Sequence, residues 1–182
     1  MPRTLIPLAQ GCEELEAVTL IDLLRRAGIE VITAGLDGQP VVASRGVVLI
    51  PDTQLEEVLE HSFDLVVLPG GMPGADHLDN DPRIHQILKR AVAAGNYIAA
   101  ICAAPKVLAN AGLLEGKRAT SYPGFLDSME LPKVTVERLP VVRDGRVITS
   151  RGPGTAMDFA LELIELLVGR EKRDEVEAAL VR

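Results

Sequence analysis

The sequence contains no tryptophan, and only two tyrosines and three phenylalanines occur among its 182 residues. Proteins that bind single-stranded nucleic acid stack bases on aromatic side chains, so this composition disfavours such a surface. Basic residues are in the minority as well, because 19 Lys and Arg stand against 26 Asp and Glu and give a net charge of −7. The positive field that attracts phosphates is therefore missing. We expect no direct nucleic-acid-binding site.

Cysteines are also scarce, and the two that occur, Cys12 and Cys102, lack the Cys-x-x-Cys or Cys/His spacing of a zinc site. We expect two single thiols, with neither a disulfide framework nor a metal. No apolar run approaches the roughly 20 residues that a membrane span needs. The short apolar stretch at the N-terminus is followed by Glu13 and Glu14, unlike a secretory signal. These features predict a cytoplasmic protein with no membrane segment.

Hydrophobic periodicity alternates along the chain between strand-like runs and helix-like stripes. Apolar runs at residues 4–8, 31–34, 65–68 and 97–101 are typical of strands covered on both faces. Apolar residues at helical spacing over 13–27 and 83–94, ended by Gly28 and Gly95, predict the helices between them. The length suits one domain, residues 1–182. The sequence thus predicts an α/β fold around a mostly parallel sheet.

Two further segments indicate antiparallel hairpins appended to the parallel core. They are residues 41–50, interrupted at 44–46, and residues 141–149, with an Asp144-Gly145 turn. Thr155 is a candidate N-cap for a helix over 156–168, and a charged terminal helix follows from Arg170. Pro7 is unexpected in the first strand, because proline removes an N–H from the ladder, and the sequence offers no explanation.

Cys102 is the first candidate catalytic residue. It follows the apolar run 97–101 directly and precedes Ala103, Ala104 and Pro105, which open a helix, as in the strand-turn-helix of a nucleophile elbow. A thiol at a helix N-terminus is expected to have a pKa below the ordinary value of about 8.5. The alternative is that Cys102 is a small buried hydrophobic residue, the commonest role of a free cysteine. Spacing alone leaves both open.

Two other loops belong at the same edge of the sheet, where ligands collect in α/β folds. Gly70 and Gly71 follow a strand and allow backbone N–H groups to face an oxyanion, although a tight turn would need the same glycines. Glu13 and Glu14 are typical of solvated charges at a helix start. Glu16 follows the apolar Leu15, so its position on the helix differs from that of Glu13 and Glu14 and its side chain is predicted to face inward across the strand ends. A carboxyl beside a thiolate would stay protonated there and donate a hydrogen bond to the sulfur.

None of the three histidines is a sequence neighbour of Cys102. We expect His61 and His85 at the surface, whereas His77 follows the glycine-rich loop and could approach the site, so the sequence alone does not establish a Cys-His pair. Cys12 is expected to be a structural thiol.

Four segments together resemble the ThiJ/PfpI superfamily, and closely its Parkinson-disease-protein-7 (YajL-like) branch. They are Gly-Cys-Glu-Glu-Leu-Glu at 11–16, Leu-Pro-Gly-Gly at 68–71, Ala-Ala-Ile-Cys-Ala-Ala-Pro at 99–105 and Thr-Ser-Arg-Gly-Pro-Gly-Thr at 149–155. The resemblance implies a flavodoxin-like, doubly wound sandwich of the class I glutamine amidotransferase-like type over residues 1–182. It also implies Cys102 as the nucleophile, Glu16 as its protonated partner, and oxyanion donors at Gly71 and Ala103.

The same resemblance implies a homodimer packed through the first helix, with Leu15 in the interface. The residues it places around the cleft are Gly70, Tyr122, Arg26 and Arg45. Family members commonly have a His before a Pro near the cysteine, whereas this chain has Tyr122 there. General acid/base catalysis would then depend on Glu16 or water. Protease-like members have His directly after the nucleophile, and Ala103 in that place disfavours peptidase activity.

The resemblance and the residues together lead to two hypotheses. The first is cofactor-independent detoxification of methylglyoxal or glyoxal to 2-hydroxy acids, or repair of glycated protein or nucleotide adducts, through addition of the Cys102 thiolate. The second is an oxidative-stress sensor or redox chaperone in which Cys102 is oxidised to a sulfinic acid. A relative without activity is a third possibility.

Overall fold

A seven-stranded sheet forms the centre of the protein in the computed structural model, which describes residues 1–182. Its strand order is β10-β11-β7-β6-β1-β2-β5, and every neighbouring pair is parallel except β10 and β11. The predicted α/β fold with a mostly parallel sheet is therefore confirmed. The strands of this sheet are β1 (Arg3–Leu8), β2 (Glu30–Gly35), β5 (Thr53–Gln54), β6 (Leu65–Leu68), β7 (Tyr97–Ile101), β10 (Val141–Asp144) and β11 (Val147–Ser150).

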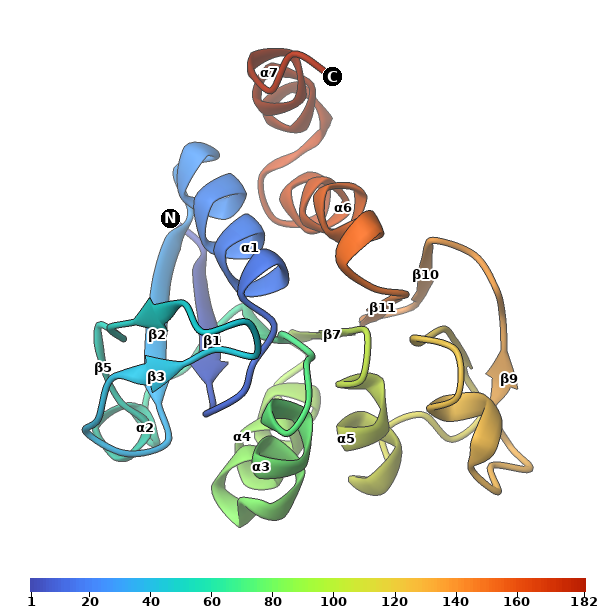
Figure 1. Cartoon of the computed structure of the whole chain (residues 1–182). Helices are drawn as coiled ribbons and strands as arrows, with labels where there is room; N and C mark the ends of the chain where they lie inside the picture. The colour runs from blue at the N-terminus through green and yellow to red at the C-terminus, as the bar shows by residue number, and fades with distance from the viewer.

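Helices cover both faces of the sheet, with one group above it and one below it in Figure 1. Side chains alternate between the faces along each strand, so Leu5 belongs to one apolar core and Ile6 to the other. This burial on two faces explains the continuous apolar runs in the sequence. The first group is α1 (Glu14–Arg26), α6 (Ala156–Val168) and α7 (Arg170–Ala179), and the second is α2 (Leu55–Val58), α3 (Gly74–Asn80), α4 (Pro82–Ala93) and α5 (Pro105–Asn110).

Both predicted hairpins form, but only β10–β11 joins the central sheet. Strands β3 (Val41–Val42) and β4 (Val48–Leu49) make a separate antiparallel pair, and β8 (Arg118–Ala119) and β9 (Thr135–Val136) make a parallel pair that the sequence did not predict. Two short 3-10 helices, η1 (Leu126–Ser128) and η2 (Pro153–Thr155), complete the chain.

Thr155 stands at the predicted N-cap position of α6, but its side chain does not cap the helix, because η2 precedes the helix and turns this side chain back toward β11. The hydroxyl of Thr155 accepts a hydrogen bond from the Gly152 N–H at 3.1 Å and lies 2.7 Å from the hydroxyl of Ser150. It therefore ties the segment that follows β11 to the strand end instead of capping the helix.

Pro7 lies where β1 separates from β6. The β1–β6 ladder includes only Thr4 and Leu5, whereas pairing with β2 continues to Leu8. Extending the ladder toward β6 would require an N–H at position 7, which proline lacks. The loops that follow β1 and β6 meet beyond this point, where the Glu13 N–H donates to the carbonyl of Gly70 at 2.9 Å.

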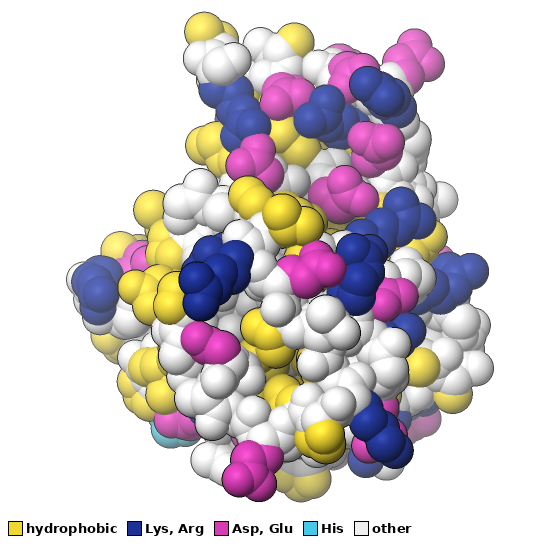
Figure 2. Space-filling view, turned by 90° about the vertical axis from the view of Figure 1, so that its right-hand side faces the viewer, with side chains coloured by type: hydrophobic (Ala, Val, Ile, Leu, Met, Phe, Trp, Pro, Cys, Tyr) yellow, Lys and Arg dark blue, Asp and Glu magenta, His cyan; other side chains and the backbone are white.

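No helix of the protein is long and apolar enough to cross a membrane. On the face drawn in Figure 2, basic side chains are interspersed with acidic and apolar ones and form no continuous basic patch. This face therefore offers no extended surface for a polyanion.

Candidate active site

Cys102 lies in a strained turn at the end of β7. Its φ of +65° is in the left-handed region that residues with side chains rarely adopt, a conformation that costs about 1–3 kcal/mol. Two backbone hydrogen bonds hold it there: the Cys102 N–H donates to the carbonyl of Ser150 at 3.0 Å, and its own carbonyl accepts from the Tyr122 N–H at 2.8 Å. The turn leads to α5, so the predicted strand-turn-helix geometry is present.

The glycine loop after β6 packs against this turn with no room for side chains. A Cβ atom at Gly70 would lie 2.7 Å from the Cβ of Cys102, and one at Gly71 would lie 2.4 Å from the Glu13 nitrogen. Gly71 also has a φ of +87°. Both positions therefore require glycine, and the close approach lets backbone N–H groups reach the buried groups of the site.

Glu16 lies in the first turn of α1 and is fully buried. Its Oε2 atom accepts a hydrogen bond from the Gly70 N–H at 2.8 Å. Its Oε1 atom has no hydrogen-bond partner. The Glu16 side chain lies near enough to the thiol of Cys102 for each group to shift the pKa of the other. Glu13 positions this side chain, because its carboxylate caps α1 by accepting from the Glu16 N–H at 2.8 Å.

The two buried groups perturb each other's ionisation. Burial raises the pKa of Glu16 to about 7, although the Gly70 N–H and the Cys102 thiol oppose this change. Burial raises the pKa of Cys102 to about 12, and the negative charge of Glu16 and the hydrogen bond between the two side chains contribute to this rise. The backbone N–H groups of Gly71 and Ala103 oppose it.

The direction for Cys102 is opposite to the one predicted from the start of a helix. Cys102 is only 8% exposed, so ionising it places a charge away from water, and a facing carboxylate adds repulsion. In addition, α5 has six residues, Pro105–Asn110, so its dipole is short. A low thiol pKa at this position thus depends on whether Glu16 carries a proton.

A cavity of about 290 Å³ opens over Cys102. Of the residues predicted for the site, four others line it: Arg45, Gly71, Ala103 and Tyr122. The residues that the sequence analysis did not place here are Glu13, Ser44, Met72, Phe125 and Pro153. Of these, only Glu13 could have been identified from the sequence, because it stands three residues before Glu16 at a helix start, where a capping side chain is expected. The others come from loops that only the fold brings together.

Arg26 does not lie at this cavity within the chain, contrary to the expectation. It is in the last turn of α1 and forms an ion pair with Asp22 at 2.7 Å. Ten residues of helix separate it from Glu16, which corresponds to about 15 Å along the axis.

Glu14 is a second correction, because it is buried and not solvated. Its carboxylate accepts hydrogen bonds from the Ser44 hydroxyl at 2.9 Å and the Arg45 N–H at 2.7 Å. Burial alone would raise the pKa of Glu14, but its hydrogen bonds outweigh burial and the pKa is lowered. Glu14 therefore fixes the loop that carries Arg45 beside the cavity.

Cys12 is fully buried, as expected of a structural thiol. Burial and the charges of Glu14 and Glu13 raise its pKa to about 12.

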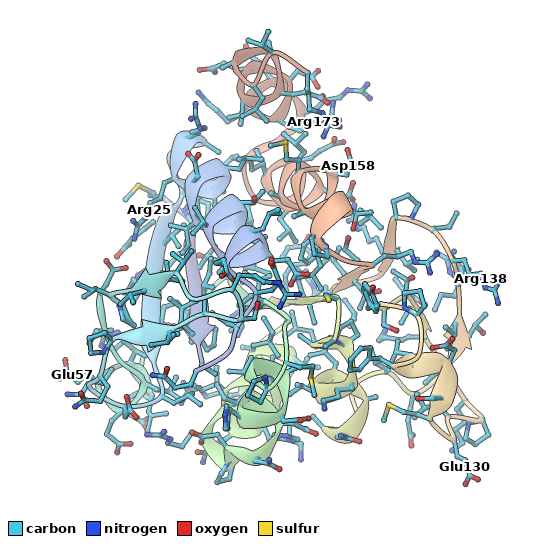
Figure 3. The ribbon with its side chains drawn as sticks, in the orientation of Figure 1. Arg25, Glu57, Glu130, Arg138, Asp158 and Arg173 are labelled. Atoms are coloured by element: carbon cyan, nitrogen blue, oxygen red, sulfur yellow. The ribbon has the colours of Figure 1, made fainter.

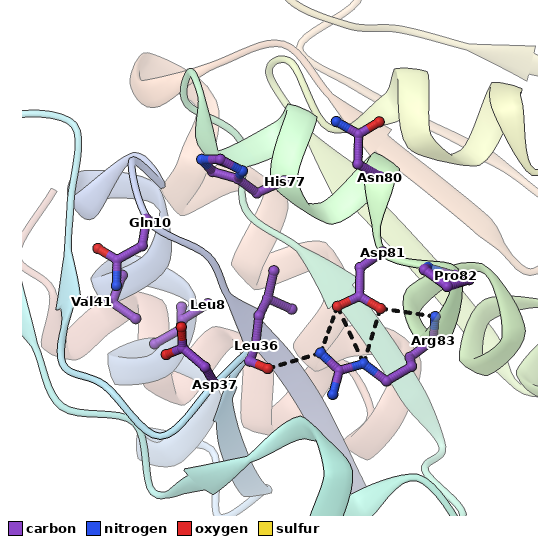
Figure 4. A pocket seen from close by; sticks show the side chains of 10 residues that line it. All are labelled: Leu8, Gln10, Leu36, Asp37, Val41, His77, Asn80, Asp81, Pro82 and Arg83. Atoms are coloured by element: carbon purple, nitrogen blue, oxygen red, sulfur yellow. Dashed lines mark hydrogen bonds and ion pairs between the residues drawn. The ribbon is translucent and has the colours of Figure 1, made fainter.

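A larger cavity, of about 550 Å³, lies at the ends of β1 and β2, away from Cys102 (Figure 4). His77 lines this cavity and not the one over Cys102. The guanidinium group of Arg83 is held there by Asp81 at 2.7 Å and by the carbonyl of Leu36 at 2.8 Å. The positive charge of Arg83 is thus compensated by the negative charge of Asp81.

The profile of the DJ-1/PfpI family matches residues 2–166, around the thiol and carboxyl described above. The chain belongs to the DJ-1/PfpI family. It is 45% identical over 179 residues to Protein DJ-1 homolog A of Arabidopsis thaliana, covering 97% of this chain but spanning only 46% of that relative. It is 38% identical over 167 residues to the glutathione-independent glyoxalase DJR-1.2 of Caenorhabditis elegans, covering 92% of this chain and 89% of that protein.

The fold agrees with solved structures of the DJ-1/PfpI family. The crystal structure of Drosophila melanogaster DJ-1beta superposes with a TM-score of 0.95 at 44% identity, covering 99% of this chain and 97% of that one. The flavodoxin-like architecture expected from the resemblance is thereby confirmed.

Proposed function

We propose that this DJ-1/PfpI protein is a cysteine-dependent enzyme that converts methylglyoxal or glyoxal to the 2-hydroxy acid. The observation that carries the proposal is the contact between the strained Cys102 and the buried carboxyl of Glu16, beneath a cavity that admits a small molecule. The similarity to a relative named as a glutathione-independent glyoxalase supports it.

The Cys102–Glu16 pair is proposed to act with a single proton. A buried pair of this kind loses its protons in two steps that belong to both groups, here near pH 7 and pH 12, so between these values one proton remains. For the reaction, we propose that this proton passes from the Cys102 sulfur to Glu16, and that Oε1 receives it, because Oε2 already accepts from the Gly70 N–H and Oε1 has no hydrogen-bond partner. The N–H groups of Gly71 and Ala103 then stabilise the thiolate of Cys102.

The reaction follows from this protonation state. The thiolate adds to the aldehyde carbon and forms a hemithioacetal, whose oxyanion is stabilised by the same two amides. Glu16 first gives its proton to this oxyanion. Its carboxylate then takes the proton from the former aldehyde carbon and returns it to the neighbouring carbon, while the hydroxyl proton passes to the ketone oxygen, so the first carbon is oxidised to a thioester and the ketone is reduced to an alcohol. Water hydrolyses the thioester and releases lactate and the free thiol. Oxidation and reduction balance within the substrate, so no external reductant is required.

Lactate formation from methylglyoxal tests the proposal directly. We expect Cys102→Ala to abolish it and Cys12→Ala, at the buried thiol that the mechanism does not use, to retain turnover once folding is verified by circular dichroism. Glu16→Gln should lose at least about 100-fold in kcat, since general acid/base groups contribute about 10²–10⁴-fold. Equal rates for the wild type and Cys102→Ala would overturn the proposal.

Oxidation sensing is a second candidate, favoured by the difference in accessibility between the two thiols. Cys102 is 8% exposed and faces two amides, whereas Cys12 is 0% exposed. Mild peroxide should therefore add two oxygen atoms to Cys102 before Cys12 reacts, as measured by mass spectrometry of peptides. Earlier oxidation of Cys12 would contradict this role.

We also propose a homodimer through α1, whose outer face carries unpartnered apolar side chains. Leu15 is 51% exposed and Val18 is 45% exposed. Leu15→Arg should convert the dimer to a monomer in light scattering, whereas Val92→Arg, at an exposed site on α4, should not. A monomeric wild type would contradict the assembly.

A further inference from the structure

Four arginines have no ion-pair partner, and three of them line cavities at or beside the active site. Of the 14 arginines in the sequence, ten form an ion pair with a carboxylate. Arg146 instead stacks on the ring of Tyr97, with its guanidinium carbon 5.0 Å from the ring centre. The remaining three are Arg45, Arg138 and Arg151. In a chain of net charge −7, such uncompensated cations are the exception.

Arg138 and Arg151 face a second cavity, of about 410 Å³, which adjoins the one over Cys102. The two cavities share a wall formed by residues 121–123 and 151–153. Tyr122 belongs to the Cys102 side, while its neighbours Ser121 and Pro123 line the second cavity. The Tyr122 ring packs on Gly152, where an added Cβ would lie 3.2 Å from it. The Tyr122 ring thus separates the two cavities, and a molecule bound at Cys102 would have to extend past this ring to reach the second cavity.

Neither acidic residue of the second cavity forms an ion pair with Arg138 or Arg151, so both guanidinium groups are free to bind an anion. Glu137 lines it, and its Oε1 atom is paired with Arg118 at 3.2 Å, whereas its buried Oε2 atom has no hydrogen-bond partner. Asp127 lines it too and accepts from the Gly124 N–H at 2.7 Å. Arg151 donates to the backbone carbonyl of Arg138 at 3.3 Å, which brings the two residues together. In Figure 3, Arg138 lies on the segment that leads into β10.

We propose that the second cavity is an anion subsite in which Arg138 and Arg151 bind the carboxylate of an extended substrate. Guanidinium groups match carboxylates in shape and charge, and their hydrogen bonds are strengthened by both charges. The subsite rests on the proposed function and narrows it: the preferred substrates are carboxylate-bearing adducts of methylglyoxal, with the carbonyl-derived carbon at Cys102. The adduct's carbon–sulfur bond breaks as its hydroxyl becomes the aldehyde and the departing thiol takes the proton; Cys102 then adds to that aldehyde.

The test compares two hemithioacetals of methylglyoxal that differ in one group. One is formed from N-acetylcysteine, which bears a carboxylate, and the other from N-acetylcysteine amide, which is neutral, at equal free methylglyoxal. We expect the wild type to have a KM about tenfold lower for the carboxylate. The Arg138→Met/Arg151→Met variant should lose this preference and keep its kcat/KM for free methylglyoxal. A control that also removes two positive charges, Arg143→Met/Arg170→Met, should keep the preference.

A binding measurement separates this subsite from the proposed function. The S-(2-hydroxypropyl) thioethers of the same two thiols have no aldehyde and cannot react, so their affinity for the Cys102→Ala protein can be measured by calorimetry. Tighter binding of the acid, lost in Arg138→Met/Arg151→Met, supports the subsite even if methylglyoxal is not turned over. Equal binding of the acid and the amide overturns the subsite and leaves the proposed function standing.

Discussion

Replacing Glu16 by glutamine should stabilise the protein at neutral pH while removing a group that the proposed chemistry needs. The amide side chain would keep the size of the protonated carboxyl and its place beside the Gly70 N–H, but it cannot ionise. The buried carboxyl of Glu16 has its pKa raised from 4.5 to about 7. An acid that is harder to ionise in the folded state than in the unfolded chain destabilises the fold once the pH exceeds its unfolded value.

The sign and size of the effect follow from proton binding. Between pH 4.5 and 7 the folded protein holds a proton that the unfolded chain has released, so the free energy of unfolding falls as the pH rises. At about 1.36 kcal/mol for each pH unit, the loss is about 3 kcal/mol and is complete above pH 7. The wild type and Glu16→Gln should therefore be similar near pH 4.5, and the variant should be about 3 kcal/mol more stable at pH 8. For a chain of this length, that corresponds to about 6–12 °C in Tm.

Urea unfolding at a series of pH values from 4.5 to 8 measures this difference. Glu14→Gln is the matched control, because Glu14 lies in the same helical turn and its pKa is lowered. Its carboxylate stabilises the fold above its unfolded pKa, and this contribution is lost as the pH falls. The control should thus be less stable than the wild type at pH 8, with the gap closing toward pH 4. If the advantage of Glu16→Gln did not change between pH 4.5 and 8, the raised pKa of Glu16 would be refuted.

Three further predictions concern the site and its surroundings. The ultraviolet absorbance of the Cys102 thiolate should appear only above about pH 9 in the wild type, because burial and the charge of Glu16 raise the pKa of Cys102 to about 12, and its midpoint should be lower in Glu16→Gln, which removes that charge; a wild-type midpoint near pH 7 would place the shared proton on Glu16. Gly70→Ala should lower the free energy of unfolding in urea by about 2–4 kcal/mol and also lower turnover, because the added Cβ would lie 2.7 Å from the Cβ of Cys102. The control Gly154→Ala should be nearly neutral, because no atom lies within 4 Å of the added Cβ. Asp81→Ala should cost about 1–2 kcal/mol through loss of the α4 cap and leave lactate formation unchanged; a fall in turnover would link the larger cavity to catalysis.

The central elements of the fold could be predicted from the sequence because each carries a strong periodic signal. Strand β7 has the predicted bounds, Tyr97–Ile101, and α6 has the predicted 156–168. The elements that were missed are short, such as β8 (Arg118–Ala119) and β9 (Thr135–Val136). Two residues cannot display a periodicity, and their pairing depends on contacts between segments 17 residues apart. Long-range packing, which sequence pattern does not record, decides such elements.

Some features of the site could be predicted from the sequence and others could not, because only some of them are local. The register of Glu16 and the position of Cys102 after a strand are local features, and the structure places these two side chains together. The direction of the thiol pKa is not local, because it depends on burial by β11, on the Gly70–Gly71 loop and on the charge of Glu16. The place of Arg26 came from the resemblance alone, together with the expected homodimer, and within the chain it lies at the opposite end of α1 from Glu16.

The geometry implies that the site is a source of instability that the two apolar cores offset. A left-handed Cys102, a carboxyl buried without full hydrogen bonding and two glycines with no space around them all lie within one contact of each other. Each is unfavourable for folding, and each has a use in the proposed chemistry: the turn exposes the sulfur to the cavity, the unpartnered oxygen holds a proton for it, and the glycines admit the amides. Substitutions that relieve these costs should therefore raise stability as they lower turnover, which is the pattern expected of an active site and not of a buried structural cysteine.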